Sequence, residues 1–144
     1  MKILILNGPN LNMLGIREPE IYGKETYEDL CDNLEEIAKH LNLNIEVKQS
    51  NHEGVLVDWI QESRNHFDGI IINAAAYTHT SIAILDALKA VSLPTVEVHL
   101  SDINQREPYR KHSYIREACK ATFFGKGFES YKEAMTYLEG EIKK

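Results

Sequence analysis

Short apolar segments alternate along the chain with longer segments in which apolar residues recur every three or four positions. Continuous apolar runs are typical of parallel strands buried on both faces. A strict alternation of apolar and polar residues, as at 44–48, indicates a strand near a sheet edge. These two patterns predict five strands, at residues 3–6, 44–48, 69–72, 95–98 and 122–124.

The segments between these strands carry the periodicity of amphipathic helices. In the first, Leu30, Leu34, Ile37 and Leu41 are spaced by four, three and four residues. Thr26, three residues before Asp29, resembles a capping box that would start this helix. Similar spacing predicts further helices that contain residues 55–60, 82–88 and 131–142. The helix that contains residues 55–60 would end near Asn65 and His66.

Strictly alternating strands and helices predict an α/β fold with an open parallel sheet and right-handed crossovers. Five such units fit a flavodoxin-like three-layer sandwich, with the five-stranded parallel sheet in order 2-1-3-4-5 and helices on both faces. The chain has 144 residues, which suits a single catalytic domain over residues 1–144. In this strand order ligands bind beyond the carboxyl ends of the strands, at the switch point between the first and third strands.

Composition narrows the possible partners. The chain is 43% hydrophobic and 26% charged, with a net charge of −6, which argues against general binding to nucleic acid or to a membrane surface. The two cysteines, Cys31 and Cys119, show no metal or redox spacing and fit reduced thiols in a cytoplasmic protein. No signal peptide and no apolar run long enough to span a bilayer is expected.

The connection after the first strand is the most unusual part of the chain. It reads N-G-P-N-L-N-M-L-G-I-R-E-P-E-I-Y-G from Asn7 to Gly23, far longer than the two to six residues typical of such loops. Asn73 and His99 end the third and fourth strands. Topology therefore predicts that Asn7, Asn73 and His99 meet at one edge of the sheet.

The sequence lacks the signature motifs of several protein classes that have this fold. Residues 8–15 do not end in the Gly-Lys-Ser/Thr of a phosphate-binding loop, and the dinucleotide fingerprint is also absent after the first strand. The acidic pair of a phospho-receiver is replaced by Asn7 and Gly8, and no metal-binding spacing occurs among the six histidines. A flavin-binding loop remains an alternative, although it gives no reason for an arginine in the first connection.

Two pairs of residues indicate proton transfer. A guanidinium at Arg17 would favour the phenolate form of Tyr22, whose pKa is ordinarily near 10. Glu97 and His99 lie two residues apart on one strand, so both point to the same face, and a carboxylate behind an imidazole makes a competent proton donor.

Residues farther along complete a candidate site. The backbone N–H groups of Leu100 and Ser101, where the chain turns after the fourth strand, form a plausible carboxylate nest. Arg110 lies in a polar stretch, residues 104–113, that would overhang the same edge of the sheet. Each of these features has an ordinary structural explanation when taken alone.

Taken together, five motifs give the chain a strong resemblance to the type II 3-dehydroquinate dehydratases. The first is the opening stretch from Asn7 to Gly23. The others are Q-S-N-H-E-G at 49–54, N-A-A-A-Y-T-H-T-S at 73–81, E-V-H-L-S at 97–101 and R-E-P-Y-R-K-H-S-Y at 106–114. The resemblance extends over nearly the whole chain, and the order of the motifs makes it specific.

The resemblance implies a lyase of the shikimate pathway that converts 3-dehydroquinate to 3-dehydroshikimate through an enolate. The roles that the resemblance implies are Tyr22 as the base, Arg17 as the residue that holds Tyr22 as phenolate, and His99, oriented by Glu97, as the acid. A water held near Asn12 and Pro9 would stabilise the enolate. The implied substrate-binding residues are Asn73, His79, Asp86, Leu100, Ser101 and Arg110.

The resemblance also implies an assembly and a location. The chain would form a homododecamer, a tetramer of trimers, in which Asp86 reaches a neighbouring site. The substrate is a small anion, no cofactor or metal is implied, and a cytoplasmic location is expected. Two rival interpretations are a flavodoxin-like binding or electron-transfer domain and a non-catalytic scaffold, although the presence of Arg17, Tyr22 and His99 speaks against the latter.

Overall fold

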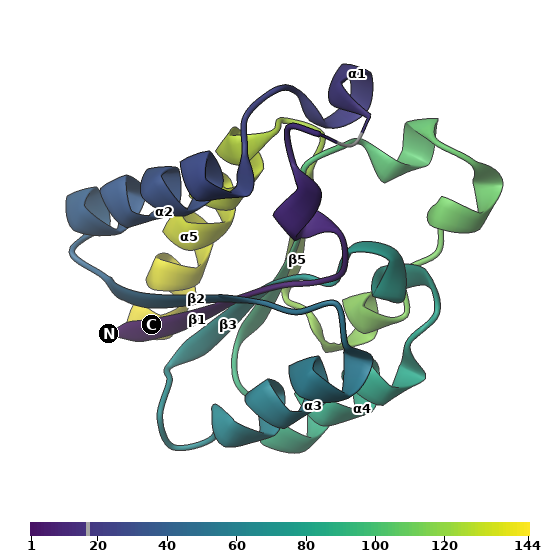
Figure 1. The fold of residues 1–144 in the computed structure, drawn as a ribbon. Helices are drawn as coiled ribbons and strands as arrows, with labels where there is room; N and C mark the ends of the chain where they lie inside the picture. Colours follow the sequence, from purple (N-terminus) through teal and green to yellow (C-terminus); the bar gives the residue numbers. More distant parts are fainter. Residues whose placement is uncertain (17) are drawn as a thin grey trace.

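The computed structural model describes residues 1–16 and 18–144, and its centre is a parallel sheet of five strands. The strand order is β2-β1-β3-β4-β5, which confirms the predicted order 2-1-3-4-5 (Figure 1). The strands are β1 (Lys2–Asn7), β2 (Asn44–Gln49), β3 (Gly69–Asn73), β4 (Thr95–His99) and β5 (Ala121–Phe124). All neighbouring strands pair in parallel.

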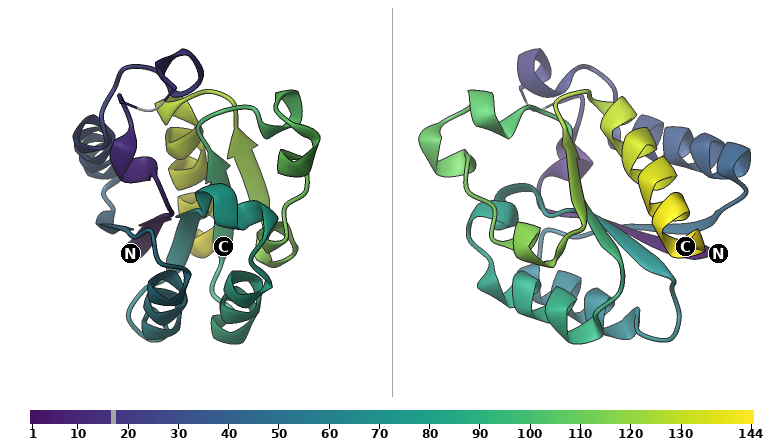
Figure 2. Two further views of the ribbon diagram at one scale, coloured as in Figure 1. Left: turned by 45° about the vertical axis from the view of Figure 1, so that its right-hand side comes forward. Right: turned by 180° about the vertical axis from the view of Figure 1, so that it is seen from behind.

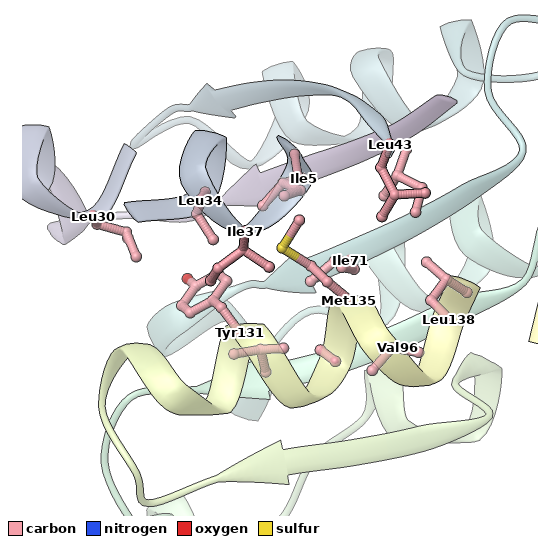
Figure 3. Close-up of a cluster of buried hydrophobic side chains, with 14 of the residues drawn as sticks. Ile5, Leu30, Leu34, Ile37, Leu43, Ile71, Val96, Tyr131, Met135 and Leu138 are labelled. Atoms are coloured by element: carbon pink, nitrogen blue, oxygen red, sulfur yellow. The ribbon is translucent and has the colours of Figure 1, made fainter. Parts of the chain in front are cut away.

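Helices cover both faces of the sheet, as predicted for a three-layer sandwich. On one side lie α2 (Tyr27–Leu41) and α5 (Phe128–Lys143), and on the other α3 (Glu53–Glu62) and α4 (Ile82–Val91) (Figure 1). Successive residues of a strand point to opposite faces. Ile3 and Ile5 accordingly join the apolar cluster under α2 and α5 (Figure 3), while Leu4 and Leu6 join the cluster over α3 and α4.

The start of α2 follows its sequence signal closely. The hydroxyl of Thr26 accepts from the backbone N–H of Asp29, and the Asp29 carboxylate accepts from the backbone N–H of Thr26. The predicted capping box is therefore confirmed. At the other end Asn42 adopts a left-handed conformation, φ 57°, which suits an asparagine that ends a helix.

The connections at the carboxyl edge contain short helices that the hydrophobic periodicity did not predict. The first connection holds η1 (Leu11–Met13) and α1 (Pro19–Tyr22), and the segment after β3 holds η2 (Ala75–His79). The connection from β4 to β5 holds η3 (Ile103–Gln105), η4 (Pro108–Arg110) and η5 (Ile115–Ala118). Segments of three to five residues are too short to show a helical repeat. Figure 2 shows the first connection and the β4–β5 connection on the same edge of the sheet.

The ends of β1 and β3 touch at this edge. The backbone N–H of Gly8 donates to the carbonyl of Asn73 over 2.8 Å. A Cβ atom added to Gly8 would lie 2.5 Å from the carbonyl oxygen of Ala74, so only glycine allows this approach. The predicted meeting of the first and third strand ends is confirmed. Among the described residues, no helix is both long enough and apolar enough to cross a membrane.

Candidate active site

A cavity of about 210 Å³ opens at the carboxyl ends of β1, β3 and β4. Six of the predicted site residues line it: Asn73, His79, His99, Leu100, Ser101 and Arg110. Leu11, Met13 and Leu14 of the first connection supply an apolar wall opposite these polar groups. A small concave site with a few converging polar groups is the usual form of a pocket for a small polar ligand.

Glu97 and His99 meet at the floor of this cavity. Both side chains are almost fully buried, and His99 Nε2 lies 2.5 Å from Glu97 Oε2. A carboxylate oxygen only accepts, so Nε2 carries a proton that it donates to Glu97. The other ring nitrogen, Nδ1, is then the one left to exchange a proton with a ligand.

The Glu97 carboxylate is surrounded by donors from the β4–β5 connection and from β5. It accepts from Arg116 Nε at 2.9 Å, from the Ser113 hydroxyl at 2.9 Å and from the Thr122 hydroxyl at 3.0 Å. Burial alone would raise the pKa of Glu97, but the hydrogen bonds and charges of His99 and Arg116 outweigh it and lower this pKa to about 2. Glu97 is therefore ionised throughout the neutral range and orients His99 without exchanging a proton.

Sequence reasoning missed the three donors that complete the Glu97 environment. Ser113 lies inside one of the recognised motifs, at 106–114, and could have been proposed from it. Arg116 and Thr122 lie 19 and 25 residues from Glu97, and no local pattern relates them to it.

His79 lies on η2 at the side of the cavity. Its Nδ1 is 2.7 Å from the carbonyl oxygen of His112, and because a carbonyl only accepts, Nδ1 carries the proton. Burial, with the nearby charges of His99 and Arg110, lowers the pKa of His79 below its ordinary value of 6.5. The neutral ring therefore offers the lone pair of Nε2 as a hydrogen-bond acceptor.

Two arginines lie at the rim of the cavity, and each is paired with a carboxylate that is not part of the cavity lining. Arg110 Nε donates to Glu107 Oε2 over 2.7 Å, and Arg106 lies 3.7 Å from Glu18 Oε2 and 3.9 Å from Glu107 Oε2. Both arginines line the cavity, but only Arg110 was predicted as a site residue. Arg106 belongs to the same recognised motif, which is the signal that could have found it. The two guanidinium groups in the cavity lining suit a small anion despite the net charge of −6.

Asn12 and Asp86 lie away from the cavity lining. Asn12 is exposed on η1, and its amide oxygen accepts from Gln49 Nε2 over 3.4 Å. Asp86 is exposed on α4. Arg17 lies outside the described residues, and of Tyr22 the structure describes the place in α1 but not the side chain.

Neither a metal centre nor a disulfide is found in the described part of the chain. No group of three or more histidine, cysteine or acidic side chains gathers there as metal ligands would. Cys31 and Cys119 are free thiols, and burial raises the pKa of Cys119 to about 12, which keeps it a weakly reactive thiol.

The comparisons with known proteins agree with the motifs. The family described as "Dehydroquinase class II" matches residues 1–139. The 3-dehydroquinate dehydratases of Geotalea daltonii and Clostridium acetobutylicum are 54% and 49% identical over 144 residues, which is all of this chain and all of theirs. The crystal structure of the type II dehydroquinase from Butyrivibrio crossotus superimposes with a TM-score of 0.94 at 49% identity, covering 96% of this chain and 97% of that one. The chain therefore belongs to the class II dehydroquinases, the enzyme family of type II 3-dehydroquinate dehydratases.

Proposed function

We propose that this chain dehydrates 3-dehydroquinate to 3-dehydroshikimate through an enolate, with Tyr22 as the base and His99 as the acid. The substrate is a β-hydroxy ketone. Removal of the proton alpha to the ketone leaves an enolate, which then expels the β-hydroxyl group. That group leaves as water once it has received a proton, and the product is a conjugated enone. The phenol at Tyr22 and the imidazole at His99 then return to their starting forms by proton exchange with solvent.

The Glu97–His99 pair is the observation that carries this proposal. Hydroxide is a poor leaving group, so the elimination needs a positioned proton donor. His99 lines the cavity, and its Nε2 is engaged by a carboxylate that stays ionised. To act as the acid, the ring must also carry a proton on Nδ1, as an imidazolium facing the Glu97 carboxylate, and that proton is the one transferred to the departing oxygen.

The base is proposed from chemistry and from its place in the chain. A phenol with a pKa near 10 is a poor base at neutral pH, and lowering that pKa by about two units requires about 2.7 kcal/mol. Arg17, five residues before Tyr22, is the proposed source of that stabilisation. The first connection supports this role because Pro9, Leu11 and Leu14, on the same connection, line the cavity.

The remaining site residues are proposed to bind the substrate and the developing enolate. Asn73, His79 and Arg110, with the backbone N–H groups of Leu100 and Ser101, would hold its hydroxyl and carboxylate groups. A water held near Asn12 and Pro9 would donate to the enolate oxygen, where preorganised donors have their largest effect. Pro9 lines the cavity, and Asn12 lies three residues after it, on η1 between the cavity-lining residues Leu11 and Met13.

Assembly, organisation and cellular role are also proposals. We infer one catalytic domain over residues 1–144, assembled as a homododecamer in which Asp86 completes a neighbour's site. The exposed position of Asp86 on α4 is compatible with such a contact. We further propose a cytoplasmic enzyme of the shikimate pathway.

Hydrogen exchange separates the two catalytic roles. Formation of the conjugated product is followed by its ultraviolet absorbance, and we expect Tyr22→Phe and His99→Ala each to lose about two to four powers of ten in kcat. In heavy water, His99→Ala should still exchange the alpha proton of the substrate without dehydrating it, whereas Tyr22→Phe should do neither. Exchange by Tyr22→Phe and none by His99→Ala would show that the roles are reversed.

A further inference from the structure

A chain of buried hydrogen bonds leads from the cavity into the core between α2 and α5. Its first member, Asn73, is 3% exposed and lines the cavity. Asn73 Nδ2 lies 3.0 Å from the hydroxyl oxygen of Tyr131, and that oxygen lies 2.6 Å from Asn7 Oδ1. Tyr131 and Asn7 have no exposed surface, and Tyr131 belongs to the apolar cluster of Figure 3.

The backbone N–H of Ala75 shows which groups donate and which accept along this series of hydrogen bonds. The backbone N–H of Ala75 lies 3.1 Å from the Asn73 side chain and can only donate, so the atom that faces it must be Oδ1. Nδ2 must then face Tyr131 and donate to its oxygen. The hydroxyl hydrogen of Tyr131 is left for Asn7 Oδ1, which can only accept.

The same polarity continues beyond Asn7. With its oxygen engaged by Tyr131, Asn7 donates through Nδ2 to the hydroxyl oxygen of Tyr27 over 3.3 Å. Burial raises the pKa of both Tyr27 and Tyr131, so both phenols remain protonated and keep their donor roles.

We propose that Tyr131 is a positioning residue, which holds the Asn73 amide so that it presents a hydrogen-bond donor to the cavity. Ala75 occupies one acceptor site of Asn73 Oδ1 and Tyr131 takes one Nδ2 hydrogen, which leaves the second Nδ2 hydrogen as the donor that Asn73 can offer a ligand. This end of the site then selects a ligand oxygen that accepts, such as a hydroxyl or ketone oxygen. The proposal rests on the proposed function in one respect, the contact of Asn73 with substrate.

The main test compares two phenol deletions. Tyr131→Phe removes the oxygen that orients Asn73, whereas Tyr27→Phe removes the same group from the far side of Asn7 and leaves the Tyr131–Asn73 bond intact. We expect Tyr131→Phe to raise KM roughly threefold to tenfold with kcat changed less than twofold, because a lost binding contact of this kind acts on substrate and transition state alike. Tyr27→Phe should keep the KM of the unchanged enzyme.

A second pair of variants tests whether Asn73 donates to the ligand, and it does not depend on how well Tyr131→Phe folds. Asn73→Asp can still accept from Ala75 and Tyr131, but it offers the cavity only acceptor oxygens. Asn73→Ala offers nothing. A donor role predicts a larger rise in KM for Asn73→Asp than for Asn73→Ala.

The possible outcomes separate this inference from the proposed function. If Asn73→Ala raises KM and Tyr131→Phe does not, the positioning role is wrong and the substrate contact stands. If Asn73→Ala leaves KM unchanged, the substrate contact and the positioning role both fail. Equal KM values for Asn73→Asp and Asn73→Ala would overturn the donor role of Asn73.

Discussion

The floor and the rim of the cavity are built differently. The floor is defined by Asn73 and His99, which line the cavity, and by Asn7 and Glu97 on the same strands, and these residues are at most 4% exposed. The rim is defined by Glu18, Arg106, Glu107 and Arg110 of the two overhanging connections. Its ion pairs involve carboxylates whose side chains are 44% and 46% exposed.

This difference separates fixed chemistry from adaptable binding. On the floor, the Glu97–His99, Asn73–Tyr131 and Tyr131–Asn7 hydrogen bonds are buried, and leaving a partner unpaired there costs about 1–3 kcal/mol or more. Exposed ion pairs, in contrast, contribute about 0–1 kcal/mol and weaken in salt. The floor therefore holds proton donors and acceptors in place before a ligand arrives, while the rim can exchange partners when an anion binds.

Among changes that compare the floor with the rim, neutralising the floor carboxylate should have the largest effect. Glu97→Gln keeps the size of the side chain but removes the charge opposite His99 and leaves Arg116 without its counter-ion. We expect kcat to fall by about one to two powers of ten, because the imidazole loses its orientation and electrostatic support. Steady-state kinetics would show this, with Glu46→Gln, an exposed strand glutamate, as the matched control. Normal turnover in Glu97→Gln would contradict the idea that the floor holds its proton donors and acceptors in place before a ligand arrives.

An intermediate effect concerns acid stability. The pKa of Glu97 is about 2 in the folded chain, below its ordinary value of 4.5. Its ionisation therefore stabilises the fold fully above pH 4.5, and this contribution is lost as the pH falls towards 2. The shift corresponds to about 3 kcal/mol. Urea unfolding between pH 6 and 2 should show a steeper loss for the unchanged chain than for Glu97→Gln, and parallel curves would place the stabilisation elsewhere.

The smallest effect should come from the rim. Glu18→Gln removes a carboxylate 3.7 Å from Arg106, a partly exposed pair, so the free energy of unfolding should change by less than about 1 kcal/mol. Because Arg106 lines the cavity, we expect a modest fall in KM for the anionic substrate at low salt, and that fall should shrink as salt is added. A loss of stability as large as that of the floor variant would remove the distinction between floor and rim.

Much of the molecule follows from local patterns in the sequence. The apolar runs, the spacing of Leu30, Leu34 and Ile37, and the Thr26–Asp29 cap predicted the strands, the helices and their order. The topology rules for parallel sheets then predicted where the polar strand ends would meet, and the motifs identified the family. Each of these inferences depends on residues close together in sequence or on general rules of chain connection.

Only the tertiary structure decided which donors complete the site. The Arg116 and Thr122 side chains reach Glu97 from 19 and 25 residues away, and Tyr131 reaches Asn7 from 124 residues away. The short helices of the two overhanging connections were also missed, because three or four residues carry no periodicity. Hydrogen bonds between distant segments depend on how the layers pack, and a single sequence contains no local signal for that geometry.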